Sequence, residues 1–193
     1  MPIRRHLASS AGPLWRHANP YYFLPMIHVC SLARLHDTVA GTGARHVVSL
    51  IGDEAAIERP SSVAVGNHLR LRMHDICTPL DGHILPQEAH IAALIDFVRR
   101  WDRRTPLVVH CYAGISRSTA GAFASVCALN PHRDERTIAL DLRRASPTAT
   151  PNMRIVSLAD RLLGREGRMV AAIELIGRGV LAAEGAPFRL TLE

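Results

Sequence analysis

The chain contains no lysine: its 23 basic residues are all arginine, and with 17 acidic residues they give a formal net charge of +6. We attribute this bias to codon usage in a GC-rich, bacterial genome. The alternative is a surface for acidic partners or nucleic acid. However, the arginines are dispersed, and aromatic residues make up only 5% of the chain. The clustered basic and aromatic footprint of a nucleic-acid-binding protein is therefore missing, and we expect no nucleic-acid partner.

Long hydrophobic runs and paired cysteines are also missing. No apolar run approaches the ~18 residues that a membrane span needs, and no signal peptide is apparent, so we expect a cytoplasmic protein. The chain has four cysteines without a CxxC pair: Cys30, Cys77, Cys111 and Cys127. This spacing favours neither a zinc site nor a disulfide framework, and no metal or other cofactor is predicted.

The 193 residues, 48% of them hydrophobic, are enough for one domain with a substantial core. Apolar and β-branched runs predict strands at 25–30, 45–51, 69–73 and 107–110. Helical spacing predicts helices that start at Ser31 and Pro86, and others at 116–129, 134–144, 152–163 and 168–181. The fold class that follows is α/β, with a small, mostly parallel central sheet of four or five strands flanked by helices.

The most informative segment is residues 110–119, His-Cys-Tyr-Ala-Gly-Ile-Ser-Arg-Ser-Thr, between a predicted strand and a predicted helix. A tight loop there directs backbone N–H groups inward, and the helix start adds free donors and a positive dipole end. Such a nest binds a tetrahedral anion and favours the thiolate form of Cys111. The planar guanidinium of Arg117 can grip two oxygens of one phosphate.

This segment resembles the signature loop of the cysteine-dependent protein tyrosine phosphatase superfamily, and its Gly-Ile-Ser-Arg-Ser ending is most similar to the dual-specificity branch. The resemblance implies a protein tyrosine phosphatase-like fold in which Cys111 attacks phosphorus and forms a phosphocysteine. Arg117 and the backbone of residues 112–117 (Tyr112, Ala113, Gly114, Ile115, Ser116 and Arg117) would bind the phosphate. His110 would orient the loop, and Ser118 would help to release the sulfur.

The general acid must lie outside the loop, and two aspartates are candidates. We favour Asp75, which follows the strand at 69–73, as the equivalent residue does in dual-specificity phosphatases. Asp81 is the rival, although in Leu-Asp-Gly it also suits a turn. Asp53 is interpreted as a helix-start residue. Asn152 is interpreted both as a helix N-cap and, by resemblance, as a support of the phosphate cradle.

The remaining cysteines are interpreted as apolar filler, although a protective disulfide between Cys77 and Cys111 stays open. The resemblance divides the chain into an N-terminal lead-in (1–24), a phosphatase domain (25–165), and a C-terminal helix and tail packed on that domain (166–193).

Phosphotyrosine on proteins is the expected substrate, with phosphoserine and phosphothreonine as further candidates. A phosphoinositide or nucleotide substrate is less favoured, because phosphoinositide-selective members tend to have loop lysines. A cysteine loop of this kind is also compatible with a catalytically silent phosphate-binding module. It is compatible, too, with a rhodanese or arsenate-reductase relative, although these lack the His-Cys start together with Gly-Ile-Ser-Arg-Ser.

Overall fold

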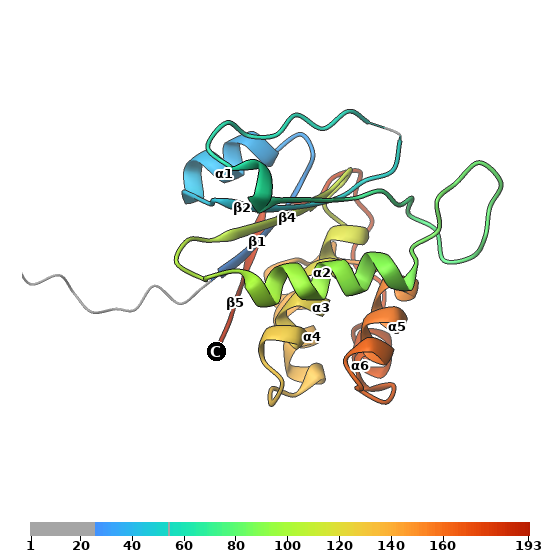
Figure 1. Ribbon diagram of the computed structural model, residues 1–193. Helices are drawn as coiled ribbons and strands as arrows, with labels where there is room; N and C mark the ends of the chain where they lie inside the picture. Colours follow the sequence, from blue (N-terminus) through green and yellow to red (C-terminus); the bar gives the residue numbers. More distant parts are fainter. Residues whose placement is uncertain (1–25, 54) are drawn as a thin grey trace, which may run out of the picture.

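The computed structural model describes residues 26–53 and 55–193 and has a five-stranded sheet at its centre (Figure 1). The strand order is β3-β2-β4-β1-β5. The strands are β1 (Met26–Ser31), β2 (His46–Leu50), β3 (His68–Leu71), β4 (Leu107–Cys111) and β5 (Phe188–Thr191). The first four run parallel, and β5 pairs antiparallel with β1. The predicted α/β class with a mostly parallel sheet is confirmed. The predicted lead-in (1–24) lies outside the described residues.

The central strand, β4, is buried along its whole length. Its side chains alternate between the two faces of the sheet, as the period of a strand requires. Val108 packs with Val47 and the residues of α1 on one face, whereas Leu107 and Val109 belong to the larger core on the other face. A strand covered on both faces has a continuous apolar sequence, which is why this strand is recognisable from its residues alone.

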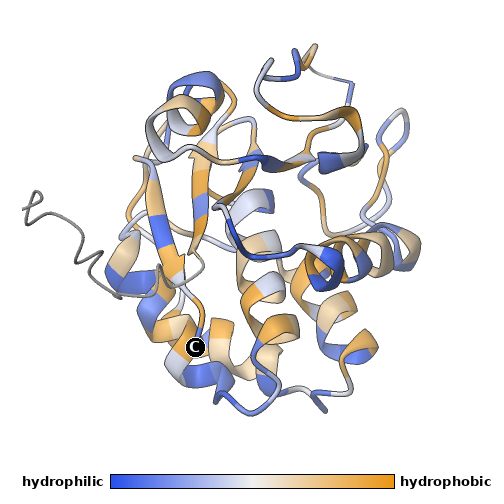
Figure 2. Cartoon of the chain, turned by 60° about the vertical axis from the view of Figure 1, so that its left-hand side comes forward, coloured by the Kyte–Doolittle hydropathy of each residue, from blue (hydrophilic) through white to orange (hydrophobic). Residues whose placement is uncertain are grey.

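Helices cover both faces of the sheet in Figure 1. One face carries α1 (Leu35–Thr42). The other carries α2 (Glu88–Arg100), α3 (Arg117–Leu129), α4 (Glu135–Ala145), α5 (Met153–Leu162) and α6 (Arg168–Ile176). All of α3 except Ala128 is buried, because the sheet, α2, α4 and α5 surround it. The other helices mix hydrophobic and hydrophilic residues along their length (Figure 2), as expected for helices that bury one face.

The helix predicted from Ser31 begins only at Leu35, because Ser31 is the last residue of β1. The helix predicted for 168–181 ends at Ile176, since Gly177 takes a φ of 61° there. The chain then runs past the sheet as the tail 177–187 and forms β5, which was not predicted. The interpretation of Asp53 as a helix-start residue is wrong. Residues 55–64 contain no helix, and the Oδ2 of Asp53 accepts a hydrogen bond from Arg72 Nη2 at 2.7 Å.

The four parallel strands all end at the same edge of the sheet, where ligands bind in open α/β folds. Cys111 ends β4 and Ser31 ends β1, while Asp75 follows β3 in the chain. The topology therefore brings residues from three strand ends to one place. Within the described residues, no helix is long and apolar enough to cross a membrane.

Candidate active site

The predicted signature loop joins the last residue of β4, Cys111, to the first residue of α3, Arg117. The side chain of Cys111 lies at the bottom of this loop and is almost fully buried. Its Sγ accepts a hydrogen bond from the Gly114 N–H at 3.3 Å and lies 3.1 Å from Ser118 Oγ. An N–H and a hydroxyl at the sulfur are donors of the kind that stabilise a thiolate.

Gly114 allows the loop to pack against the end of β1. Its φ is +74°, and a Cβ atom at this position would lie 2.8 Å from Ser31 N and 2.9 Å from the carbonyl carbon of Cys30. Both neighbours are backbone atoms, so they could move aside only if the backbone of β1 shifted. Leu32 N donates to Tyr112 O across the same contact at 3.1 Å. Only glycine fits here, for reasons of both backbone conformation and space.

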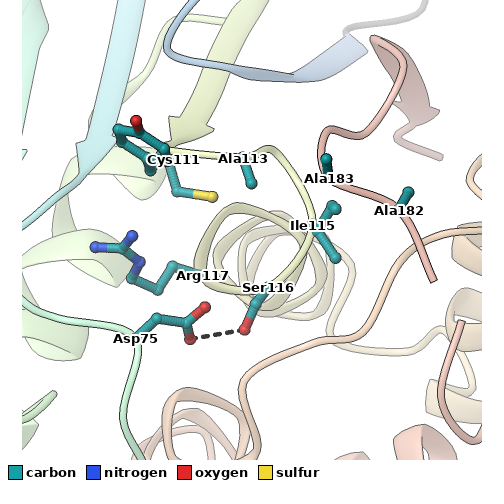
Figure 3. Close-up of a pocket in the computed structure, with 9 residues that line it drawn as sticks. Asp75, Cys111, Ala113, Ile115, Ser116, Arg117, Ala182 and Ala183 are labelled. Atoms are coloured by element: carbon teal, nitrogen blue, oxygen red, sulfur yellow. Dashed lines mark hydrogen bonds between the residues drawn. The ribbon is translucent and has the colours of Figure 1, made fainter.

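Arg117 is 5% exposed at the start of α3. Its Nη1 donates to the carbonyl oxygen of Met73 at 2.8 Å, which ties the guanidinium to the segment that follows β3. Figure 3 shows its side chain beside those of Cys111 and Asp75 around one cavity. The guanidinium is thus held in place before any anion arrives, which is the condition for strong electrostatic stabilisation.

Asp75 reaches the same cavity from the segment after β3. Its Oδ1 accepts hydrogen bonds from Ser116 Oγ at 2.7 Å and from Asn152 Nδ2 at 2.8 Å (Figure 3 draws the first). The structure therefore brings Asp75, Cys111 and Arg117 together. Asp81 lies in an exposed part of the following segment and does not line the cavity.

The side chain of Asn152 both accepts and donates hydrogen bonds. Its Oδ1 accepts from the backbone N–H groups of Arg154 and Ile155 at 3.1 and 3.2 Å, so it is the N-cap of α5. Its Nδ2 donates to Asp75, and its backbone N–H donates to Ser116 O at 3.3 Å. The N-cap interpretation is confirmed. The backbone of Asn152 thus contacts the loop at Ser116, while its side-chain amide binds the Asp75 carboxylate.

His110 is fully buried behind the loop and joins a polar chain that the sequence did not indicate. Ser49 Oγ lies 2.6 Å from His110 Nε2 and 2.7 Å from His68 Nε2. Burial lowers the pKa of both histidines to about 4. Both rings are consequently neutral at pH 7. Because the Ser49 hydroxyl has a single proton, it donates to one ring and accepts from the other.

The remaining cysteines divide into two kinds. Cys30 and Cys127 are buried as predicted, and burial raises the pKa of each thiol to about 12. The interpretation of Cys77 as apolar filler is wrong. It is exposed, with its Sγ 3.8 Å from Asn152 Oδ1, because the segment after β3 runs over the surface. No group of three or more possible metal ligands occurs in 26–53 or 55–193.

The cavity has a volume of about 460 Å³. Its lining consists of Asp75, Cys111, Tyr112, Ala113, Ile115, Ser116, Arg117, Ala182 and Ala183. The two alanines come from the tail, which no sequence signal connected with the site. A pocket with a buried thiol, a backbone N–H at its sulfur, a fixed guanidinium and a carboxylate at its edge can bind a tetrahedral oxyanion. It can also deliver a nucleophile and a proton to that anion.

Comparisons with known proteins concern the family resemblance and the fold. Residues 74–146 match the family model of protein-tyrosine phosphatases. None of the curated protein sequences compared with the chain matches it. Among solved structures, DUSP15 has 18% identity and a TM-score of 0.59, over 79% of this chain and 91% of that one. The PTP-2 phosphatase of Cydia pomonella has 20% identity and a TM-score of 0.55, over 70% and 84%.

A third structure, the human tyrosine phosphatase-like serine/threonine/tyrosine-interacting protein, has 16% identity and a TM-score of 0.57, over 72% and 92% of the two chains. At these identities, the likenesses establish the fold. Together with the family model, they confirm the resemblance of residues 110–119 to the protein tyrosine phosphatase superfamily.

Proposed function

We propose that this chain, which has the sequence signature and the fold of protein tyrosine phosphatases, hydrolyses phosphate monoesters through a phosphocysteine intermediate. The observation that carries the proposal is the convergence of Cys111, Arg117 and Asp75 on one cavity, with Ser118 at the sulfur. A catalytically silent module needs only the anion cradle. The additional thiol, hydroxyl and carboxylate therefore favour an enzyme.

In the first step, the Cys111 thiolate forms a bond to phosphorus while the bond from phosphorus to the ester oxygen breaks. Asp75 gives its proton to the leaving oxygen. Arg117 and the loop N–H groups hold the three equatorial oxygens, whose charge has to be stabilised in the transition state. The contact between Arg117 and Met73 O supports this role, because it fixes one arm of the guanidinium.

In the second step, water attacks the phosphocysteine and loses a proton to the Asp75 carboxylate. The bond between sulfur and phosphorus then breaks, and inorganic phosphate leaves. Ser118 Oγ, 3.1 Å from the sulfur, donates to the departing thiolate. The hydrogen bonds from Ser116 and Asn152 keep the Asp75 carboxylate near the cavity between the two steps.

The substrate we propose is phosphotyrosine on proteins, with phosphoserine and phosphothreonine as further candidates. A loop without lysine supports a phosphoprotein over a phosphoinositide. Location in the cytoplasm remains a prediction of the sequence.

The test is hydrolysis of p-nitrophenyl phosphate in the presence of a chelator, by the wild type and by Cys111→Ser. We expect turnover only in the wild type, and a wild type that binds phosphate analogues without turnover would overturn the proposal. A panel of phosphopeptides, phosphoinositides and nucleotides then decides between the substrate classes.

A further inference from the structure

A second and larger cavity, of about 770 Å³, adjoins the catalytic one. We call it the tail groove. It shares Asp75, Ile115, Ser116 and Ala182 with the catalytic cavity. The rest of its lining is Cys77, Thr150, Pro151, Asn152, Met153, Arg178, Gly179, Val180 and Leu181. The two cavities are therefore neighbours, and a substrate whose phosphate lies at Cys111 can extend toward the tail groove.

The tail that walls this groove is fastened on both sides of its apolar residues. At the start of these residues, Gly179 N donates to Thr150 Oγ1 at 3.1 Å, and the N–H of the first of them, Val180, donates to Pro147 O at 2.9 Å. After them, Gly185 N donates to Ala113 O in the signature loop at 2.9 Å. A Cβ atom at Gly185 would lie 2.8 Å from Gly114 O, so the tail touches the loop directly.

Large apolar side chains are nevertheless left exposed on this fixed segment. Val180 is 66% exposed and Leu181 is 97% exposed, next to a candidate active site. Exposed apolar side chains clustered on a fixed surface are typical of binding sites. Further, no hydrogen bond within the described residues involves the backbone of Leu181, Ala182 or Ala183.

We propose that the tail groove binds the peptide chain that flanks phosphotyrosine in a protein substrate. A large apolar side chain near the phosphotyrosine would pack against Val180, Leu181 and Met153. An acidic side chain would pair with Arg178, which has no ion pair within the described part of the chain. The free backbone groups of residues 181–183 would bond the peptide backbone. This proposal rests on the proposed phosphatase function and names the substrate class of that same site.

Two observations favour a peptide over a lipid chain. The lining of the groove includes the charged guanidinium of Arg178, which has no ion pair within the described part of the chain and which an acyl chain would cover without a partner. The unpaired backbone groups of the tail also match the hydrogen-bonding groups of a peptide, and an acyl chain has none. A peptide with an apolar and an acidic residue satisfies all of these surfaces.

The experiment compares kcat/KM for phosphotyrosine peptides with kcat/KM for p-nitrophenyl phosphate, and reports the ratio of the two. The peptides carry leucine or alanine, and aspartate or arginine, at the positions beside the phosphotyrosine. In the wild type, we expect the ratio to be highest for peptides with both leucine and aspartate. In Leu181→Ser it should fall about tenfold for leucine peptides, the effect of removing part of a buried leucine contact.

Arg178→Glu provides a sharper test, because it should lower the ratio for aspartate peptides and raise it for arginine peptides. A general structural defect cannot invert a charge preference. Leu175→Ser and Arg136→Glu are the matched controls, since both residues are exposed and lie outside the groove. They should leave every ratio at its wild-type value.

The outcomes separate the two proposals. If p-nitrophenyl phosphate is hydrolysed but the ratios do not depend on the flanking residues or on Leu181 and Arg178, the tail groove proposal is overturned and the phosphatase stands. If a short-chain phosphatidylinositol phosphate is preferred and Leu181→Ser impairs only that substrate, a lipid occupies the groove and the peptide proposal is again overturned. If no phosphate ester is hydrolysed, the proposed function itself fails.

Discussion

Lowering the pH from 7 to 5 is expected to cost the fold about 2 kcal/mol of stability through His110 alone, since its folded-state pKa is lowered to about 4. The ring has no exposed surface, and its Nε2 lies 2.6 Å from Ser49 Oγ. Desolvation is the main cause of the lowered pKa, and the charges of His68, Arg117 and His36 act in the same direction. A hydrogen bond with the backbone of Cys111 opposes them.

The sign follows from proton uptake in the two states. In the unfolded chain, a histidine binds a proton near pH 6.5, whereas His110 in the folded chain does so only near pH 4. Between these values, the unfolded state holds more protons and is favoured as the pH falls. The contribution of His110 is therefore fully present above about pH 6.5 and is lost progressively toward pH 4.

The assay is urea unfolding of the wild type and of His110→Asn at pH 7, 6 and 5. The free energy of unfolding of the variant should fall by about 2 kcal/mol less between pH 7 and pH 5 than that of the wild type. His68 also has a lowered pKa, but it is present in both proteins and its effect largely cancels. His132→Asn, at an exposed position, controls for the loss of a histidine as such. Equal pH slopes for the wild type and His110→Asn would refute the reasoning.

Three further predictions concern the loop and its partners. Asp75→Asn should lower kcat by ~10²–10⁴, the range for a positioned general acid, while Asp81→Asn should leave kcat near the wild-type value. The opposite pattern would identify Asp81 as the general acid. Arg117→Lys should be nearly as inactive toward p-nitrophenyl phosphate as Arg117→Ala, because an ammonium group cannot replace the planar fork, and near-normal kinetics would contradict a bidentate role. Gly114→Ala should lower the free energy of unfolding by about 2 kcal/mol or more, since positive φ is strained and the Cβ overlaps the backbone of β1. A melting temperature equal to that of the wild type would show that β1 can move aside.

The signature loop was predictable because its requirements are local. The loop between a strand and a helix requires fixed offsets between three residues, Cys111, Gly114 and Arg117. Their spacing in the sequence is therefore enough to predict how they are arranged in the loop. The buried strand β4 and the amphipathic helix α2 were predictable for a similar reason, since each has a regular apolar pattern. Asp75 could be proposed only from its place after a strand.

The contacts around the loop were not predictable, because they join residues far apart in the chain. Ser49 and His110 are 61 residues apart, and Asn152 and Asp75 are 77 residues apart. No pattern in the sequence indicates that the two residues of either pair are in contact. Each exists because the parallel order of β2, β4 and β1 and the position of α5 bring the two ends together.

The sequence by itself therefore predicted the phosphate-binding loop at residues 110–119 and the class of the fold, which depend on short-range spacing and hydrophobic period, and it indicated Asp75 as a candidate acid only through the family resemblance. Only the tertiary structure decided what surrounds that chemistry. It placed Asp75 rather than Asp81 at the cavity, bound Asp75 to Asn152, and brought the tail against the loop through Gly185 and Ala113. The physical reason is that strand pairing and helix packing, which act between distant segments, choose these neighbours.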